Sequence, residues 1–337
     1  MRIIMASRES DWRREAENSI LLKSVSHWRE KPDRWFRGSY DRLPETVRVN
    51  PMSEEKDWVE SWLSGIGANR IPWFSGPGSA WEMPFERGSA EEEVKSLMSA
   101  LHETGRITRQ EAVSMLPVLA LDPTPGQIIL DLCASPGSKT TQICEHLGDS
   151  GAVVANEVIS GRVNTLVTNV QRHASRTVLV VQHDGRHIPR VPGSGFDGVL
   201  VDVPCTGSGT TRKNPDVWGK WRPSSGRSLH SLQYDLLTRA IELTKPGGRV
   251  VYSTCSLDPI ENEAVVARVL AGGKVRVVPR GDSLSGVPSN PGMTNWPLLN
   301  DKGELDNESK SEEYLIPTKD MAVSSQLNEC LRVWNDE

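Results

Sequence analysis

From residue 127 onward, the chain alternates between short apolar runs and longer amphipathic segments. The apolar runs, rich in Val, Ile and Leu, lie at residues 127–133, 151–158, 177–184, 197–205 and 248–255. Continuous apolar character over so few residues is typical of strands that are buried on both faces of a parallel sheet. Segments with helical periodicity lie at residues 139–148, 160–173, 228–244 and 261–272. The pattern predicts an α/β fold with a doubly wound, mostly parallel, Rossmann-like sheet.

The first part of the chain has a different rhythm, which predicts a small α+β unit. Alternation indicates a strand at residues 45–51 and another at 68–74, and residues 53–67 have the amphipathic pattern of a helix. The stretch 75–89 is rich in Gly, Pro and Ser, a composition that marks boundaries.

We therefore expect the small unit to cover residues 1–88 and a larger domain to cover 89–337. The larger domain would begin with a helical lead-in over 89–122, in which Thr108 and Glu111 have the spacing of a capping box. The catalytic sheet would follow over 127–280, and an acidic, exposed tail would end the chain.

The distribution of charge along the chain bears on whether the partner is a nucleic acid. The net charge of −5 by itself disfavours a nucleic-acid partner, but the charge is unevenly placed. Residues 160–250 hold thirteen Lys and Arg against six Asp and Glu, whereas residues 256–337 hold eight against fourteen. A basic middle third is expected of a face that binds a polyanion, although a solvated basic surface would give the same counts.

Other features of the composition exclude several classes of protein. No run approaches the roughly 18 apolar residues of a membrane span, and the N-terminus turns polar too early for a signal peptide. The five cysteines include no C-x-x-C pair and no zinc-type spacing. We therefore expect reduced thiols in a cytosol-like compartment, no membrane association and no metal site.

The turn after the first strand of the sheet is a candidate cofactor loop. It reads DLCASPGSKT (131–140) and leads directly into a predicted helix, so backbone N–H groups can approach a ligand closely. A nucleoside triphosphate would require glycines where Cys133 and Ser138 stand, and the dinucleotide pattern of glycines is also missing. An adenosyl ligand without a pyrophosphate fits better.

Two acidic residues follow the next two strands. Glu157 lies twenty positions after Gly137, a spacing that suits a carboxylate accepting from both ribose hydroxyls, and Asp184 could accept from the adenine amino group. Either acid could instead cap a following helix. Because both lie on the edge of the sheet where ligands bind, we favour the adenosine pocket.

Cys205 and Cys255 each end a buried strand, which places two thiols at one edge of the sheet. A free cysteine is more often a buried structural thiol, but a matched pair above an adenosyl site favours catalysis. The spacing does not decide which thiol attacks a substrate. Asp202 precedes Cys205 and could steady a substrate amino group or the cofactor methyl, and Lys139 could pair with that carboxylate. The basic loop 206–223, with two tryptophans, suits phosphate contact and base stacking, although it could be an ordinary solvated loop.

These motifs together resemble the RNA (cytosine-5) methyltransferases of the Sun type. DLCASPGSKT, ANEV, QHD, DVPCTGSGT and YSTCS occur in that family's order and spacing, and the upstream segment ITRQEAVSMLP is most similar to the branch that acts on tRNA. The resemblance implies a methyltransferase fold, with residues 1–88 contacting RNA, and a cytoplasmic monomer, or a nuclear one in a eukaryote. Its partner would be RNA, with tRNA as the first candidate and ribosomal RNA as the second.

The resemblance also implies the site residues. S-adenosylmethionine would be held by Glu157, Asp184, Asp202 and the loop residues Cys133, Ala134, Ser135, Pro136, Gly137, Ser138 and Lys139. Cys255 would be the nucleophile and Cys205 its helper, with Asp202 and Lys139 beside them. DNA cytosine methyltransferases attack from a Pro-Cys instead, so the choice of Cys255 depends on the RNA family.

The chemistry of cytosine explains a need for two thiols. Carbon 5 becomes a sufficient nucleophile only after a thiolate has added to carbon 6, and that thiolate must later leave. An amine methyltransferase would need neither cysteine, and a non-catalytic RNA-binding or assembly factor would be expected to have lost pocket residues.

The C-terminus departs from the family pattern. Family members continue past a segment like CLRVW into a last strand that pairs beside a sixth strand, here expected at 274–279, whereas this chain ends at CLRVWNDE. We expect either a truncated chain or a sheet edge that is capped by the segment around LRVW, because an unpaired edge invites aggregation.

Overall fold

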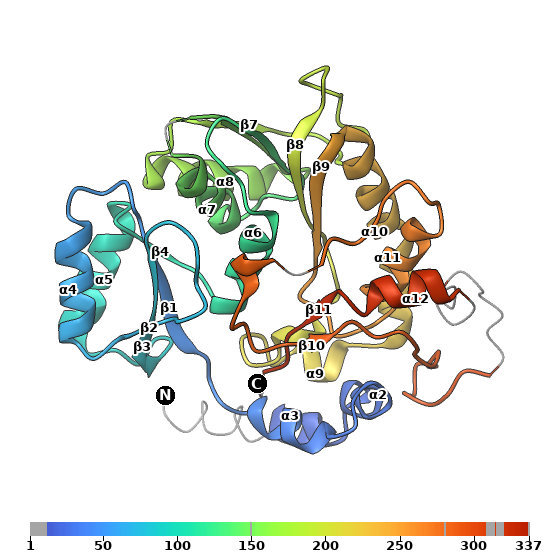
Figure 1. Ribbon diagram of the computed structural model, residues 1–337. Coiled ribbons are helices and arrows are strands. Elements are labelled where there is room, and N and C mark those ends of the chain that lie inside the picture. Colours follow the sequence, from blue (N-terminus) through green and yellow to red (C-terminus); the bar gives the residue numbers. More distant parts are fainter. Residues whose placement is uncertain (1–11, 149, 280, 308–313, 315–319, 336–337) are drawn as a thin grey trace.

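The computed structural model describes residues 12–148, 150–279, 281–307, 314 and 320–335. Its larger part is built on a five-stranded parallel sheet with the order β7-β6-β5-β8-β9 (Figure 1). The strands are β5 (Ile128–Asp131), β6 (Ala152–Asn156), β7 (Val178–Val181), β8 (Phe196–Asp202) and β9 (Thr244–Ser253). Each strand overlaps an apolar run of the sequence, and the predicted doubly wound α/β fold is confirmed.

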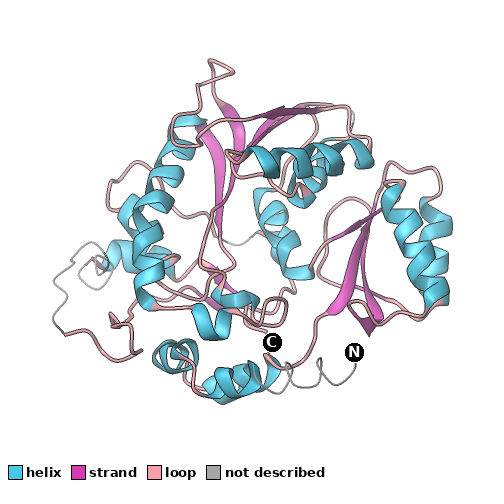
Figure 2. Ribbon diagram, turned by 180° about the vertical axis from the view of Figure 1, so that it is seen from behind, coloured by secondary structure: helices cyan, strands magenta, loops and turns pink. Residues whose placement is uncertain are grey.

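Helices cover both faces of this sheet (Figures 1 and 2). Successive side chains of a strand point to opposite faces, so Ile129 and Leu200 pack with α6 and α7, whereas Leu130 and Val199 pack with α10. The helices are α6 (Leu116–Leu121), α7 (Ser138–Leu147), α8 (Ser160–His173), α10 (Pro223–Leu243) and α11 (Glu263–Leu270). Burial on both faces explains why the strands are continuously apolar. No helix in the described ranges is long and apolar enough to cross a membrane.

A small antiparallel sheet stands beside this domain (Figure 2). Its order is β2-β3-β1-β4, from strands β1 (Pro44–Val49), β2 (Asn69–Arg70), β3 (Ser79–Glu86) and β4 (Ile107–Arg109). Helices α4 (Lys56–Gly65) and α5 (Glu92–Glu103) bury Leu63 and Met98 against Val47 of β1. The expected boundary after residue 88 therefore falls inside this sheet and its helices, because α5 and β4 come after it. The Gly- and Pro-rich stretch that suggested the boundary contains β3.

A buried ion pair joins the small sheet to the larger domain. Arg48 of β1 contacts Glu145 of α7 at 2.5 Å (Nε–Oε2) and 2.9 Å (Nη2–Oε1), and both side chains are 0% exposed. Arg48 also donates to Thr141 Oγ1 at 3.1 Å, and His173 Nε2 lies 2.9 Å from Glu145 Oε1. Burial alone would raise the pKa of Glu145, but the Arg48 guanidinium and the His173 contact keep it below its usual value. The pair therefore fixes β1 against the helix that follows the cofactor loop.

Two N-terminal helices lie against the loop that follows β8. They are α2 (Ile20–Trp28) and α3 (Pro32–Gly38), and the short helix α9 (Val217–Lys220) lies beside them. Trp35 packs on Trp218 with ring centroids 5.5 Å apart, and Trp28 meets Trp221 at 5.7 Å. The tryptophan-rich N-terminus thus forms a shared aromatic core with this loop.

Two local predictions are wrong, and so is one of the two alternatives expected for the C-terminus. Thr108 lies in β4 instead of capping a helix, since the helical turns begin only at η1 (Ala112–Met115). Residues 274–279 form no strand. The LRVW segment contributes β11 (Leu331–Arg332), which pairs with β10 (Asn290–Pro291) in a separate ribbon instead of capping β9.

The C-terminal ribbon is still anchored near the candidate site. Arg332 donates to both carboxylate oxygens of Glu263, at 2.5 and 2.6 Å, and to the carbonyl of Leu257 at 2.9 Å. Helix α12 (Met321–Leu327) precedes the ribbon. Much of the acidic stretch that was expected to be an exposed loop lies outside the described residues.

Candidate active site

The candidate loop between β5 and α7 is fixed by α8. Arg162 Nη2 donates to the Ser135 carbonyl at 2.8 Å, Ser135 Oγ donates to the Arg162 carbonyl at 3.0 Å, and Asn169 Nδ2 donates to the Pro136 carbonyl at 2.7 Å. Gly137 caps α7 with φ +108°, and a Cβ there would lie 3.0 Å from Leu166 Cδ1. A small residue is therefore required where the loop meets the helix N-terminus.

The thiol of Cys133, in the candidate cofactor loop, is unreactive. Burial, with the nearby carboxylates Asp131 and Asp202, raises the pKa of Cys133 far above its ordinary value. Its thiol therefore stays protonated at neutral pH.

The two acids at the ends of β6 and β7 differ in their surroundings. Glu157 is 3% exposed; its Oε1 accepts from the Ile159 N–H at 2.9 Å, and Arg162 Nη1 lies 3.5 Å from Oε2. Asp184 is half-buried, and Arg186 donates to both of its carboxylate oxygens, which holds the pKa of Asp184 at about 2. Each acid also accepts a backbone N–H two residues further on, but neither caps a helix, because α8 has Ile159 as its N-cap and no helix lies between Asp184 and β8. Glu157 has the burial of a ligand-binding carboxylate, and Asp184 is already engaged by Arg186.

Lys139 and Asp202 form the ion pair that the sequence suggested. Lys139 Nζ donates to Asp202 Oδ2 at 2.8 Å and to Ser114 Oγ at 3.0 Å, and Ser253 Oγ donates to Asp202 Oδ1 at 2.7 Å. The contacts come from α7, η1, β8 and β9. The first turn of α7 is thereby joined to the ends of the two strands that carry the cysteines.

The thiols of Cys205 and Cys255 are in contact. Cys205 Sγ lies 3.2 Å from Cys255 Sγ, and Cys255 is the more exposed residue. A hydrogen bond from the Cys205 thiol lowers the pKa of Cys255, and the Lys139 ammonium acts in the same direction against burial and Asp202. The same hydrogen bond, together with burial and the negative charge on Cys255, raises the pKa of Cys205. Of the two thiols, Cys255 is therefore the one that ionises more readily and Cys205 the one that holds its proton, an asymmetry that the spacing did not reveal.

A buried carboxylate holds the two cysteine loops together. Glu261, 0% exposed, accepts from the N–H of Thr206 at 2.9 Å and from the hydroxyls of Thr206 and Ser256. These residues directly follow Cys205 and Cys255. Gln233 Nε2 also donates to Glu261 at 3.0 Å. Sequence reasoning missed Glu261 because it looks like a first-turn acid of the helix predicted over residues 261–272, whereas α11 begins only at Glu263. The usable signal was the hydroxyl residue after each cysteine.

The two loops also pack closely through their backbones. The N–H of Gly209 donates to the Cys255 carbonyl at 2.9 Å, and a Cβ on Gly209 would lie 2.9 Å from that oxygen. Ser208 Oγ accepts from the Leu257 N–H at 2.7 Å. Glycine and serine after Cys205 are therefore needed for this close approach, which helps to set the separation of the thiols.

The tryptophans of loop 206–223 do not face a substrate. Trp218 is 0% exposed and Trp221 is 3% exposed, because both belong to the aromatic core with the N-terminal helices. Base stacking by these two residues is therefore a wrong prediction. Among the cations of this loop, Lys220 pairs with Asp216 at 2.6 Å, and Arg212 donates to the carbonyls of residues 41 and 42.

Known proteins share this architecture. The Saccharomyces cerevisiae protein named multisite-specific tRNA:(cytosine-C(5))-methyltransferase is 42% identical over 251 residues, which cover 68% of this chain and 36% of the relative. The Drosophila melanogaster tRNA (cytosine(34)-C(5))-methyltransferase is 45% identical over 213 residues, 58% of this chain and 29% of the relative. Ribosomal RNA small subunit methyltransferase F of Serratia proteamaculans is 39% identical over 221 residues, 64% of this chain and 45% of the relative.

A crystal structure of a methyltransferase homolog protein from Pyrococcus horikoshii matches with a TM-score of 0.68 and 28% identity, over 93% of this chain and 88% of that one. The chain spans less than half the length of the curated relatives it matches. Residues 118–297, which are 180 of its 337 residues, match the family described as 16S rRNA methyltransferase RsmB/F. This match confirms the resemblance that the motifs indicated, and the chain belongs to the RsmB/F methyltransferase family.

Proposed function

We propose that this chain transfers a methyl group from S-adenosylmethionine to carbon 5 of cytosine in RNA, through a covalent bond between Cys255 and carbon 6. The observation that carries the proposal is the pair of thiols 3.2 Å apart at the carboxyl edge of the sheet. A methyltransferase acting on amines has no use for such a pair, and neither has a non-catalytic RNA-binding factor. The names of the relatives, which are RNA methyltransferases and in two cases cytosine-5 enzymes, support the same reaction.

The loop 133–139 and Glu157 would hold the cofactor. Gly137 lets the loop pack closely on Leu166 of α8 and so sets the N-terminus of α7, and Glu157 is a buried carboxylate suited to ribose hydroxyls. Asp184 would contact the adenine only in competition with Arg186, and Asp202 would lie toward the methyl group. When bound there, S-adenosylmethionine supplies an electrophilic methyl group, which the activated carbon 5 takes.

The asymmetry of the thiols assigns their roles. The Cys255 thiolate adds to carbon 6, and the electron pair of the ring double bond is delocalised so that carbon 5 becomes nucleophilic. Cys205 donates to the sulfur before this step, which favours the thiolate at neutral pH.

Formation of the adduct prepares the second half of the reaction. The hydrogen bond to Cys255 and the charge on that sulfur are two causes of the raised pKa of Cys205. Both end when the Cys255 sulfur is bound to carbon 6, so Cys205 then ionises more readily. Its thiolate can remove the proton from carbon 5, the double bond re-forms, and Cys255 leaves as a thiolate.

For the RNA substrate we propose tRNA first and ribosomal RNA second, because both occur in the names of the relatives. The basic middle third of the chain supports a polyanionic partner. Incubation of the protein with labelled S-adenosylmethionine and either total tRNA or ribosomal RNA distinguishes the two, and 5-methylcytosine in the digested RNA identifies the product.

Trapping of the covalent intermediate tests the mechanism. Cys255→Ala should abolish turnover and give no RNA–protein adduct on a denaturing gel, because no thiolate reaches carbon 6. Cys205→Ala should also turn over poorly but accumulate the adduct, since the late step is blocked. Cys330→Ala, which removes a distant thiol, is the matched control and should behave as the wild type.

The opposite trapping pattern would exchange the roles of the two cysteines, and methylation by both variants without any adduct would refute the covalent route. The cofactor site is tested separately. Glu157→Ala should weaken binding of S-adenosylmethionine in calorimetry, because the ribose loses a charged acceptor. An unchanged affinity would contradict the proposed cofactor site.

A further inference from the structure

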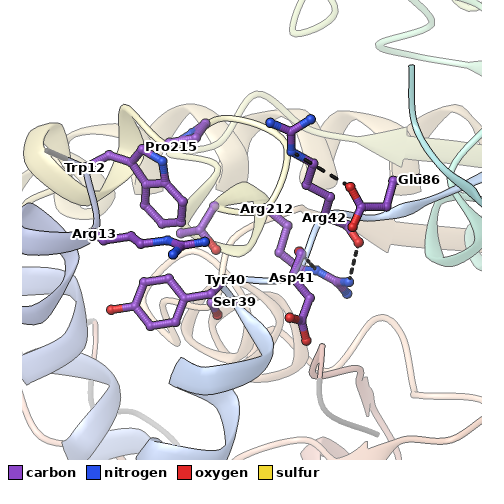
Figure 3. A pocket seen from close by; sticks show the side chains of 10 residues that line it. Trp12, Arg13, Ser39, Tyr40, Asp41, Arg42, Glu86, Arg212 and Pro215 are labelled. Carbon is purple, nitrogen blue, oxygen red and sulfur yellow. Dashed lines mark hydrogen bonds and ion pairs between the residues drawn. The ribbon is translucent and has the colours of Figure 1, made fainter. Parts of the chain in front are cut away.

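A cavity of about 350 Å³ lies beside the loop that carries Cys205. Its walls come from the N-terminal segment, the connection between α3 and β1, the end of β3 and the loop after β8 (Figure 3). We call it the flanking pocket and define it by Trp12, Arg13, Tyr40, Asp41, Arg42 and Arg212. None of these residues takes part in the proposed methyl transfer.

One wall of the flanking pocket combines aromatic rings with a cation. The rings of Trp12 and Tyr40 lie 5.5 Å apart, and the Arg13 guanidinium lies 5.5 Å from the Trp12 ring centroid and 5.6 Å from that of Tyr40. Trp12 is partly exposed, unlike the buried Trp218 and Trp221. Aromatic and guanidinium planes are the surfaces on which proteins stack unpaired bases.

The charges of the pocket favour a nucleotide over a bare anion. Arg13, Arg42 and Arg212 contribute three cations, and Asp41 and Glu86 contribute two carboxylates. The carboxylates would repel a free phosphate, but they can accept hydrogen bonds from the amino groups of a base. Arg13, whose guanidinium lies over the two rings, can meet the ribose-phosphate backbone. Arg42 lies 4.0 Å from Glu86, and Arg212 donates to two backbone carbonyls. Stacking, acceptors and cations in one cavity match the three parts of a nucleotide.

The pocket is close to the thiols along the chain and in space. A Cβ on Gly207 would lie 4.0 Å from Cys255 Sγ, and the N–H of Thr210 donates to the Gly207 carbonyl at 2.8 Å. Thr211, the next residue, lines the pocket. Four residues span at most about 14 Å, so a short single-stranded stretch of RNA can reach from one site to the other.

Arg212 holds the loop after Cys205 against the N-terminal wall of the flanking pocket. Its guanidinium donates to the carbonyls of Asp41 at 2.7 Å and Arg42 at 3.0 Å, which ties the loop after Cys205 to the N-terminal segment. A ligand that contacts both walls therefore also contacts the loop that positions a catalytic cysteine.

We infer that the flanking pocket binds an unpaired nucleotide of the RNA substrate that neighbours the target cytosine. This inference rests on the proposed function, since it assumes an RNA substrate whose cytosine reaches Cys255. Enzymes that act on a base take it out of its stack, and the neighbouring nucleotides are then free to be held elsewhere on the protein.

The first test leaves the protein unchanged. Wild-type protein is titrated with short RNA oligonucleotides that carry one central cytosine and a single abasic position, moved stepwise along the strand. We expect one position beside the cytosine at which the abasic change weakens binding by about 5- to 150-fold, the loss of one stacked base. Equal binding at every position would overturn the inference.

The second test changes the pocket. Trp12→Ala should weaken binding of the intact oligonucleotide by a similar factor, raise KM for RNA, and leave kcat at saturating RNA and the affinity for S-adenosylmethionine unchanged. With the oligonucleotide that is abasic at the sensitive position, Trp12→Ala should have no further effect. Trp58→Ala, which removes a 52% exposed tryptophan of α4, is the control and should bind as the wild type.

The outcomes separate the two proposals. Normal methylation with equal RNA binding by wild type and Trp12→Ala would refute the flanking pocket and leave the proposed function intact. Absence of methylation from every RNA, with correct cofactor binding, would refute the proposed function itself. Capture of a peptide by the pocket, without any effect of RNA, would also overturn the inference.

Discussion

Removal of the Cys205 thiol should change the ionisation of Cys255 in a direction that can be measured without any RNA. In the structure the two sulfurs are 3.2 Å apart, and the hydrogen bond from Cys205 is the largest cause of the lowered pKa of Cys255. Cys205→Ala removes this donor. Lys139 remains and still favours the thiolate, while Asp202 still opposes it. We therefore expect the pKa of Cys255 to rise in the variant.

The size of the effect follows from the strength of the lost hydrogen bond. A hydrogen bond to a charged group contributes about 1.5–3 kcal/mol. The low end applies here, because a thiol is a weak donor and Cys255 is exposed to solvent. About 1.4 kcal/mol corresponds to a tenfold smaller thiolate fraction at neutral pH. A more basic thiolate is also about threefold more nucleophilic, so the net rate of alkylation should fall only about threefold.

Because the smaller thiolate fraction and the higher nucleophilicity act in opposite directions, the curves of alkylation rate against pH for the wild type and for Cys205→Ala should cross. Near pH 7 Cys205→Ala should react more slowly with iodoacetamide at Cys255 than the wild type, whereas in strongly alkaline solution, where both thiols are ionised, it should react about threefold faster. Mass spectrometry of the Cys255 peptide gives the rate at each pH. Cys205→Ser keeps a donor at this position and should therefore lie nearer to the wild type than Cys205→Ala does.

Cys330→Ser removes a distant, partly buried thiol and should leave the Cys255 profile unchanged. Faster alkylation of Cys255 at neutral pH in Cys205→Ala would refute the reasoning. Preferential alkylation of Cys205 in the wild type would refute it as well. Both results would mean that Cys205, and not Cys255, carries the negative charge of the pair.

Two further predictions concern the buried charges around the site. Glu261→Ala should lower turnover at least about tenfold and change KM for RNA little. The reason is that Thr206 and Ser256 lose the acceptor that holds the two cysteine loops together, and one such bond contributes about 1.5–3 kcal/mol. Single-turnover kinetics separate the effect on turnover from the effect on KM. Arg48→Met should lower the free energy of unfolding by about 3–5 kcal/mol in urea titrations, because Glu145 would remain charged and buried.

Each of these predictions has a matched control. Glu261→Gln keeps the shape and one acceptor oxygen and should recover most of the turnover; a glutamine variant as slow as the alanine variant would contradict the role of Glu261 in holding the loops. Lys220→Met breaks an exposed ion pair with Asp216 and should leave stability unchanged. If Arg48→Met were equally harmless, the buried pair would not be structurally important.

The sheet and the residues at its carboxyl edge could be predicted because they depend on local patterns. Strands that are buried on both faces must be apolar throughout, and the residues after each strand then fall on one edge. This logic predicts that Lys139, Asp202, Cys205 and Cys255 lie at one edge of the sheet, and in the structure they form two contacting pairs, Lys139 with Asp202 and Cys205 with Cys255. The asymmetry between the thiols was beyond reach, because it depends on which sulfur is more exposed and which lies nearer a cation.

The errors in the sequence reading come from long-range packing. Trp218 and Trp221 look like stacking residues in a basic loop, but tryptophans some 190 residues earlier bury them. The boundary after residue 88 failed because β4, a strand of three residues, is defined by its pairing with β1 and has no pattern of its own. Glu261 was missed for a related reason, since its partners follow the ends of two other elements.

Three polar contacts of this chain join separate segments around the candidate site. Arg48 ties the small sheet to α7, whose first turn carries Lys139. Arg212 ties the N-terminal segment to the loop of Cys205, and Glu261 ties that loop to Cys255. A buried charge tolerates little displacement from its partner, because separation leaves the charge unpaired in the low-dielectric interior. Loss of one stacking contact in the flanking pocket leaves these three contacts in place, so it should lower affinity and leave kcat unchanged, whereas breaking the Glu261 contacts should lower turnover.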